Sequence, residues 1–216
     1  MKDFLLKHKL FWTDRAVLFH LLVSVGLFVI SLLLTYIATT YTKTYSQYIV
    51  PDLLLDILPV INVGIIFFQG AFIFILILVG VLFYEPKYIP FVLESTALFF
   101  FVRSLFMVMT HLTAPSVEYY NYIHHENHVK EILFTVSSGN DLFFSGHAGY
   151  PFLLALIFWQ SKYLRYFFLL SSLVGAVIVI LGHLHYSIDV FSAFFIAYGV
   201  FEISRFFFKK ERRLTL

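Results

Sequence analysis

The chain alternates between long apolar stretches and short polar segments. Six stretches are rich in Leu, Ile, Val and Phe, and they cover roughly residues 16–40, 61–84, 89–112, 144–161, 166–184 and 187–207. A bilayer core takes about 20 consecutive apolar residues per helix, so each stretch predicts one membrane span. The apolar positions do not alternate with polar ones, so a β-barrel is not expected. We therefore predict an all-α, polytopic membrane protein with a six-transmembrane-helix bundle.

The composition agrees with this pattern. Hydrophobic residues make up 60% of the 216 residues and charged residues only 13%, whereas soluble domains have about 45–50% apolar and about 25% charged residues. This balance excludes a soluble globular domain, a disordered chain and a nucleic-acid-binding protein. The absence of cysteine excludes thiol catalysis and cysteine-bound metals. We expect one membrane-embedded domain over residues 1–216, with one longer loop at about 113–143.

The basic residues predict the orientation in the membrane. If both termini are cytoplasmic, twelve Lys and Arg residues lie on that side and two, Lys43 and Lys130, lie on the other. The twelve are Lys2, Lys7, Lys9, Arg15, Lys87, Lys162, Arg165, Arg205, Lys209, Lys210, Arg212 and Arg213. Such an excess marks cytoplasmic segments. The first apolar stretch is too long for a signal peptide, and we interpret it as a retained span.

Three ionisable residues lie within the apolar stretches: His20, Glu94 and Arg103. Ionisable groups at membrane depth usually face a partner or a wet cavity. Glu94 and Arg103 are nine residues apart, about 13 Å along a helix, so they are not expected to pair directly. Arg103 lies on the outer half of its span, where its guanidinium either binds phosphate or pairs with another helix. For Glu94 and His20 we expect structural contacts.

Two polar segments of the predicted outer loops have simpler explanations than ligand binding. Asp52 and Asp56 lie four residues apart between two prolines, which predicts a short surface helix with a solvated polar face. The run His124-His-Glu-Asn-His128 contains metal-binding residue types. No regular spacing can be assumed in an irregular loop, so we expect a solvated surface rather than a metal site.

The first segment suited to catalysis is Gly139-Asn-Asp-Leu-Phe-Phe-Ser-Gly-His147, where the fourth apolar stretch begins. Ser145 and Gly146 are expected to open a helix, whose first N–H groups and positive end favour an anion, phosphate above all. Gly146 lets the backbone approach the anion closely. His147, in the first turn, can donate a proton to a leaving oxygen near neutral pH.

The second such segment is His183-Leu-His-Tyr-Ser-Ile-Asp189, between the fifth and sixth stretches. If His185 and Asp189 are both helical, their spacing of four puts them on one face. A carboxylate on one ring nitrogen fixes the tautomer, so the other nitrogen becomes a competent nucleophile. Under the predicted topology both segments lie on the outer face. Together they predict phosphoryl transfer through a phosphohistidine, with no metal required.

These residues resemble the second and third motifs of the type 2 phosphatidate phosphatase superfamily, most closely its sphingomyelin synthase-like branch. The matching stretches are Asp141-Leu-Phe-Phe-Ser-Gly-His147 and His185-Tyr-Ser-Ile-Asp-Val190. Weaker matches are Arg103 with Thr110, and the Pro-Asp-x-x-x-Asp-x-x-Pro segment at 51–59. The phosphatase branch has an arginine six residues before the nucleophile, where this chain has Val179. The departure argues against a plain phosphatidate phosphatase.

The resemblance implies a six-helix membrane enzyme with His185 as nucleophile, Asp189 as the residue that orients it, and His147 as the acid and base. It also implies that Ser145, Gly146, Arg103, Asp141 and Tyr186 bind the substrate. No cofactor and no metal are implied. The implied partners are a phospholipid donor and a lipid alcohol or water acceptor, without nucleic acid.

Three functions follow as hypotheses. The first is a phosphotransferase that moves a phosphocholine- or phosphoethanolamine-type headgroup to ceramide or diacylglycerol. The second is a lipid phosphohydrolase with water as acceptor, because the triad serves both reactions equally. The third is a small transporter, since Glu94, Arg103 and His20 could line a polar path. We expect a bacterial inner (plasma) membrane location with the active site on the extracytoplasmic face, and the oligomeric state stays open.

Overall fold

The computed structural model describes residues 2–45, 48–110, 112–116 and 143–208. Every regular element of these residues is helical. The helices are α1 (Lys2–Thr13), α2 (Arg15–Tyr45), α3 (Gly64–Tyr84), the 3₁₀ helix η1 (Pro86–Tyr88), α4 (Ile89–Met109), α7 (Gly146–Ile157), α8 (Lys162–Leu181) and α9 (Ser187–Phe207). Within the same residues, β-type pairing is limited to a bridge between Tyr48 and Leu112. The predicted all-α class is confirmed.

Five of the described helical segments are long and apolar enough to cross a membrane: Arg15–Thr42, Gly64–Tyr84, Pro86–Met109, Lys162–Leu181 and Ser187–Phe207. This agrees with an integral multi-pass membrane protein. The fourth predicted span, 144–161, contains only α7, a helix of 12 residues. Twelve residues extend about 18 Å, well short of a bilayer core of about 30 Å.

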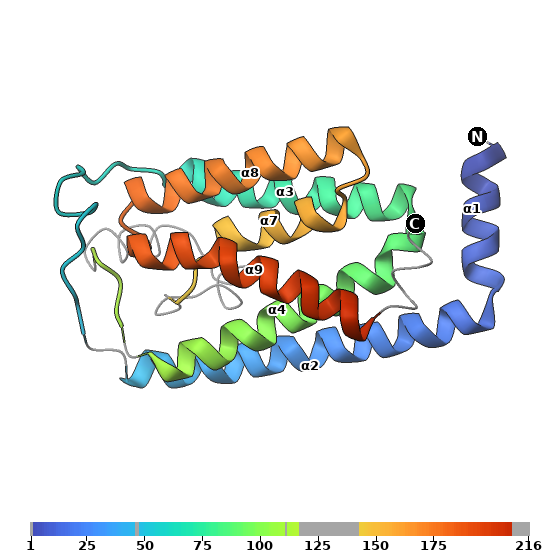
Figure 1. Cartoon of the computed structure of the whole chain (residues 1–216), viewed down its shortest axis with the longest axis horizontal. Coiled ribbons are helices and arrows are strands. Elements are labelled where there is room, and N and C mark those ends of the chain that lie inside the picture. Colours follow the sequence, from blue (N-terminus) through green and yellow to red (C-terminus); the bar gives the residue numbers. More distant parts are fainter. Residues whose placement is uncertain (1, 46–47, 111, 117–142, 209–216) are drawn as a thin grey trace.

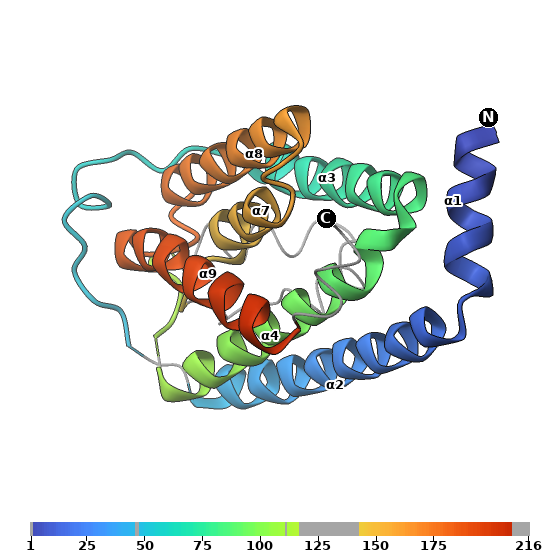
Figure 2. The same ribbon diagram turned by 45° about the vertical axis from the view of Figure 1, so that its right-hand side comes forward.

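The short α7 owes its apolar sequence to burial within the protein. Leu153, Leu154 and Ala155 have 0% exposed surface, and apolar runs of about 10–14 residues are more typical of buried helices than of spans. Figures 1 and 2 show α7 and α9 between two pairs of helices, α2 with α4 and α3 with α8. The described residues therefore give five candidate spans, and the span predicted at 144–161 is not confirmed.

The N-terminal residues form a helix that the hydrophobic pattern did not predict. Figure 1 shows α1 running across the end of the bundle, where α3 ends and α2 begins. Lys7 forms an ion pair with Glu85, and the His8 ring nitrogen Nε2 lies 2.8 Å from the carbonyl oxygen of Phe83. These contacts hold α1 against the end of α3.

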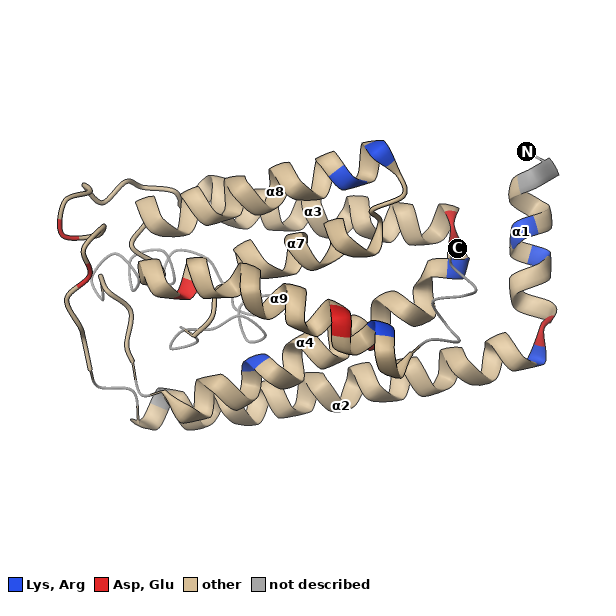
Figure 3. Ribbon diagram, viewed as in Figure 1, with Lys and Arg blue, Asp and Glu red and all other residues tan. Residues whose placement is uncertain are grey.

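Most of the Lys and Arg residues coloured in Figure 3 lie at this same end of the bundle. They belong to α1, the start of α2, η1, the start of α8 and the end of α9. Arg103, in α4, lies nearer the other end. This distribution of basic residues agrees with the pattern that predicted the orientation, and the orientation itself stays a prediction.

Polar contacts join α2 to α4 inside the apolar bundle. The hydroxyl of Ser24 donates to Oε1 of Glu94 at 2.9 Å, and Thr35 Oγ1 lies 3.0 Å from Ser104 Oγ. Glu94 is only 2% exposed. Buried polar groups need such partners, and small hydroxyl residues let two helices approach closely. The contacts support the structural role expected for Glu94.

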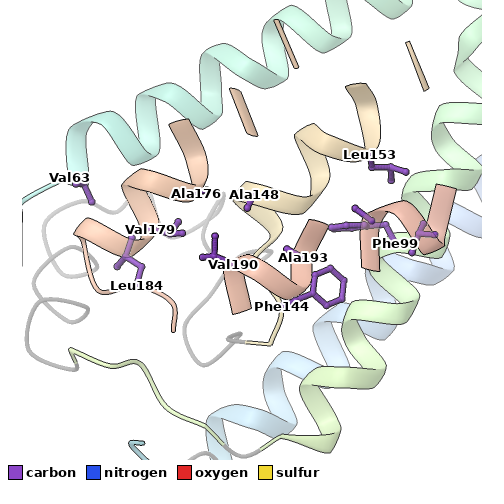
Figure 4. Close-up of a cluster of buried hydrophobic side chains, with 12 residues drawn as sticks. Val63, Phe99, Phe144, Ala148, Leu153, Ala176, Val179, Leu184, Val190 and Ala193 are labelled. Carbon is purple, nitrogen blue, oxygen red and sulfur yellow. The ribbon is translucent and has the colours of Figure 1, made fainter. Parts of the chain in front are cut away.

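The main apolar core lies where α7, α8 and α9 meet, and it also takes in Phe99 of α4 and Phe144. Figure 4 shows side chains of α7, α8 and α9 converging there, among them Ala148, Val179 and Ala193. Small residues on α7 and α8 bring the two helices close together. Ser172 Oγ donates to the carbonyl oxygen of Ala148 at 2.6 Å, and a Cβ at Gly175 would lie 2.3 Å from the carbonyl oxygen of His147.

Replacing Gly175 should therefore separate α8 from α7. A Gly175→Ala variant should lose about 1–3 kcal/mol of unfolding free energy, because overpacking of this size forces the backbone to shift. Thermal unfolding in detergent measures the effect. Gly70→Ala is the matched control, since a Cβ at Gly70 meets nothing within 4 Å. Equal melting temperatures for both variants would contradict the close α7–α8 packing.

Candidate active site

The first part of the site is the N-terminus of α7. Ser145 is the N-cap residue and Gly146 the first helical residue, as the sequence predicts. The first N–H groups of a helix have no carbonyl partner within it, so they and the positive helix end attract an anion. The Ser145 hydroxyl makes no capping bond. It is fully buried and has no hydrogen-bond partner among the described residues, so it can donate to a bound anion.

Arg103 brings a fixed positive charge to the same helix end. Its Nε donates to the carbonyl oxygen of Phe144 at 2.9 Å. The guanidinium carbon lies 3.5 Å from the position that a Cβ would take at Gly146. The sequence left a phosphate clamp and a structural pairing equally open. The geometry puts the guanidinium beside the predicted anion site, within ordinary contact distance of a Cβ at position 146.

The second part of the site begins at the end of α8. The N–H of Leu184 bonds the Val179 carbonyl at 2.9 Å, and that of His183 bonds the Ile180 carbonyl at 3.0 Å. This pair of bonds, with a left-handed residue between the helix and the next segment, is a Schellman motif. His183 is that residue, with φ 47°. The motif satisfies the last carbonyls of α8 and turns the chain directly into His185.

The start of α9 then brings His185 and Asp189 together. Asp189 is the third residue of α9, and its Oδ2 accepts from the N–H of the N-cap residue Tyr186 at 2.9 Å. The same oxygen lies 3.5 Å from Nδ1 of His185. His185 precedes the helix, so the two residues do not share a helical face as the sequence suggested. The capping interaction brings them together instead.

A backbone hydrogen bond joins the two parts. The N–H of Ser145 donates to the carbonyl oxygen of Asp189 at 3.0 Å, so the N-terminus of α7 is fixed on the first turn of α9. The imidazole of His147 lies within electrostatic range of His185 and Arg103. The ring of Phe67, from α3, packs on it with centroids 4.2 Å apart. The arrangement offers an anion site, a carboxylate-oriented imidazole and a second imidazole.

Tyr186 has a different environment from that implied by the resemblance. It is 1% exposed, and its hydroxyl donates to the Thr113 carbonyl at 3.0 Å and accepts from the Val50 N–H at 3.3 Å. These contacts support a structural role that joins two connecting segments to α9. Asp141 and the segment His124–His128 lie outside the described residues.

Asp52 is the residue whose role the sequence missed. The predicted surface helix is only a hydrogen-bonded turn, in which the Asp56 N–H donates to the Asp52 carbonyl at 2.9 Å. Asp52 is 9% exposed rather than solvated, and its Oδ2 accepts from the N–H of Ser187 at 2.7 Å and from its hydroxyl at 2.9 Å. Burial acts to raise the pKa of Asp52, but hydrogen bonds from Ser187, Leu55 and Leu54 outweigh it and lower the pKa below its ordinary value of 3.8. The role of this carboxylate is visible only in its contact with Ser187, which is distant in the sequence.

The comparisons with known proteins agree with this part of the chain. Residues 138–206 match the family model described as PAP2 superfamily C-terminal. The matched segment contains Ser145, Gly146, His147, His185 and Asp189, whereas Arg103 and Asp52 lie outside it. Comparison with curated proteins and with solved structures gives no significant match. The match supports the type 2 phosphatidate phosphatase superfamily, and with it a membrane enzyme of the lipid phosphatase or phosphotransferase type.

Across the described parts of the chain, no three His, Asp or Glu side chains cluster as a metal ion would require. The groups that the site offers are imidazoles, a carboxylate, a guanidinium and backbone N–H donors.

The space at Gly146 gives a test of the anion site. In Gly146→Ala the new Cβ makes ordinary contact with Arg103, so affinity for orthovanadate, a phosphate analogue, should stay within about threefold. The branched side chain in Gly146→Val should displace the guanidinium and lower that affinity about tenfold, the equivalent of one charge-assisted hydrogen bond. Titration calorimetry on the detergent-solubilised protein measures both, with Gly199→Val as a control in open space. Equal affinity in all three variants would rule out Arg103 as an anion ligand.

Proposed function

We propose that the chain is an integral-membrane enzyme that transfers a phosphorylated headgroup of the phosphocholine or phosphoethanolamine type. The donor is a glycerophospholipid, and the acceptor is an alcohol such as ceramide or diacylglycerol. The observation that carries the proposal is the hydrogen bond between Ser145 and Asp189. This bond joins two features into one site: a helix N-terminus suited to phosphate, and a histidine oriented by a carboxylate.

In the first step, Nε2 of His185 attacks the phosphorus of the bound phospholipid. A P–N bond forms, the P–O bond to diacylglycerol breaks, and His147 donates a proton to the departing oxygen. Asp189, on Nδ1, holds the imidazole and stabilises its positive charge. Arg103, the N–H groups of α7 and the Ser145 hydroxyl stabilise the charge on the phosphoryl oxygens.

In the second step, His147 acts as the base. It removes the proton from the acceptor hydroxyl, the acceptor oxygen attacks phosphorus, and the P–N bond breaks. His185 is thereby restored, and the headgroup leaves on the new lipid. Protons, charges and bonds balance over the two steps without a cofactor.

Hydrolysis, with water as acceptor, is the alternative function of the same site. One observation favours transfer over hydrolysis. The Phe67 ring packs on His147, the residue that would activate water. An apolar cover over the base lowers its exposure to solvent, whereas a lipid alcohol brings its own apolar surface.

Histidine variants test the phosphohistidine mechanism. His185→Ala and His147→Ala should each lower headgroup transfer at least 1,000-fold, because each variant lacks the group that the mechanism assigns to the nucleophile or to the acid and base. Headgroup-labelled phosphatidylcholine and phosphatidylethanolamine, each with and without ceramide or diacylglycerol, give the product analysis. His183→Ala is the matched control in the same junction and should keep catalysis within about tenfold.

Each result has a distinct meaning. Full activity of His147→Ala and His185→Ala would remove the mechanism and leave the transporter hypothesis. Labelled free phosphocholine or phosphoethanolamine as the sole product, with either acceptor present, would replace transfer by hydrolysis.

We also propose that the site faces the outside of a bacterial inner membrane, which rests on the resemblance and on the basic residues at the opposite end. The chain has no cysteine, so single thiols can report sidedness. In spheroplasts, an impermeant maleimide should label Asp56→Cys directly, and Lys162→Cys only after permeabilisation. Both residues are exposed in the folded chain. If Lys162→Cys were labelled directly and Asp56→Cys only after permeabilisation, the topology would be the opposite of the one proposed.

A further inference from the structure

The carboxylate of Asp52 bridges two segments that are far apart in the sequence. Its Oδ1 accepts from the N–H groups of Leu54 and Leu55, at 3.0 and 3.2 Å, and so shapes its own turn. Its Oδ2 accepts from both the N–H and the hydroxyl of Ser187. Ser187 is the first residue of α9, so Asp52 binds an N–H group that has no partner within the helix.

Two carboxylates therefore accept hydrogen bonds from the N–H groups at the start of α9. Asp189 accepts from the N–H of Tyr186, and Asp52 accepts from that of Ser187. His185 lies immediately before these two residues, and its Nδ1 faces Asp189. Any shift of this first turn changes the distance and angle between His185 and Asp189.

The segment that carries Asp52 also contacts the chain just before His185. The N–H of Ile61 donates to the Leu181 carbonyl at 2.8 Å, and His183 Nε2 lies 3.1 Å from the Leu58 carbonyl oxygen. The segment is thus attached both to the end of α8 and to the start of α9. Asp52 supplies its one charged contact with α9 among the described residues.

We propose that Asp52 is a positioning residue for the His185–Asp189 pair, acting through the first turn of α9 without contacting the substrate. The proposal rests on the proposed function, since it concerns the nucleophile of that reaction. Loss of the Asp52–Ser187 contact should lower the rate of the chemical step and leave phospholipid binding unchanged.

The test removes the contact from each side. Asp52→Ala removes the acceptor. Ser187→Pro removes both donors, and the helix tolerates it because proline is favoured at the first helical position. Tyr186, the preceding residue, already has the extended conformation (φ −69°, ψ 156°) that a following proline needs. Asp52→Asn keeps one acceptor oxygen, and Asp56→Asn is the matched control on an exposed carboxylate of the same turn.

Headgroup transfer from labelled phosphatidylcholine in mixed micelles gives kcat and KM, and thermal unfolding confirms that each variant is folded. Asp52→Ala and Ser187→Pro should each lower kcat about 10- to 100-fold, the effect of a misplaced reacting group, with KM within about twofold. Asp52→Asn should lose less, and Asp56→Asn should lose nothing. The double variant Asp52→Ala/Ser187→Pro should be no slower than the slower single variant, because both changes remove the same contact.

The pH profile adds a second readout. Because the pKa of Asp52 lies below 3.8, this carboxylate is ionised throughout the range from about pH 5 to 9, and its contribution is lost only as the pH falls through that lowered pKa. The ratio of the wild-type kcat to the kcat of Asp52→Asn should therefore be constant over this pH range. A deficit that grows or disappears within it would mean that Asp52 itself exchanges protons with substrate, and would overturn the positioning role.

The remaining outcomes separate this inference from the proposed function. Wild-type kcat in Asp52→Ala and Ser187→Pro, with His185→Ala inactive, overturns the positioning role alone. A raised KM at constant kcat, or effects that multiply in the double variant, does the same. Activity in His185→Ala overturns both proposals. If Asp52→Ala does not fold, Ser187→Pro and Asp52→Asn still give the kcat and KM that decide.

Discussion

The site depends on how three helix ends satisfy their backbone groups at one end of an apolar bundle. Unpaired N–H and C=O groups are costly away from water, so each must find a partner. The end of α8 uses its own Schellman motif, and the start of α9 uses the carboxylates of Asp189 and Asp52. The Schellman motif of α8 ends at the N–H of Leu184 and the cap of α9 begins at the N–H of Tyr186. Only His185 lies between these two residues, so its position is tightly restricted.

The third helix end, at α7, is joined to this junction and left partly open. The N–H of Ser145 is used by the Asp189 carbonyl, whereas the next N–H groups of α7 have no carbonyl partner within the helix. Arg103 lies beside them. An anion at this helix end would therefore complete the polar contacts of α7. Both the hydrogen bonding of α7 and the proposed chemistry thus favour an anion at the start of this helix.

The match to the PAP2 superfamily covers α7, α8 and nearly all of α9. Arg103 and Asp52, which approach the same site from α4 and from the segment before α3, lie outside it. The matched helices carry the groups proposed to react. The segments outside contribute the charge beside Gly146 and the contact that holds Ser187. Phe67, whose ring packs on His147, also lies outside the match.

The sequence by itself determined the helical class, the five helices that are long and apolar enough to span a membrane, and the helix start at Ser145 and Gly146. These follow from local signals, since apolar length and capping residues act within one segment. The tertiary structure alone decided that the predicted span at 144–161 contains only the short buried helix Gly146–Ile157, because burial in protein and burial in lipid select the same residues. It also decided that a cap, rather than a shared helical face, joins His185 to Asp189. Asp52 could not be recognised from its neighbours, because its partner Ser187 is 135 residues away, and only folding brings the two together.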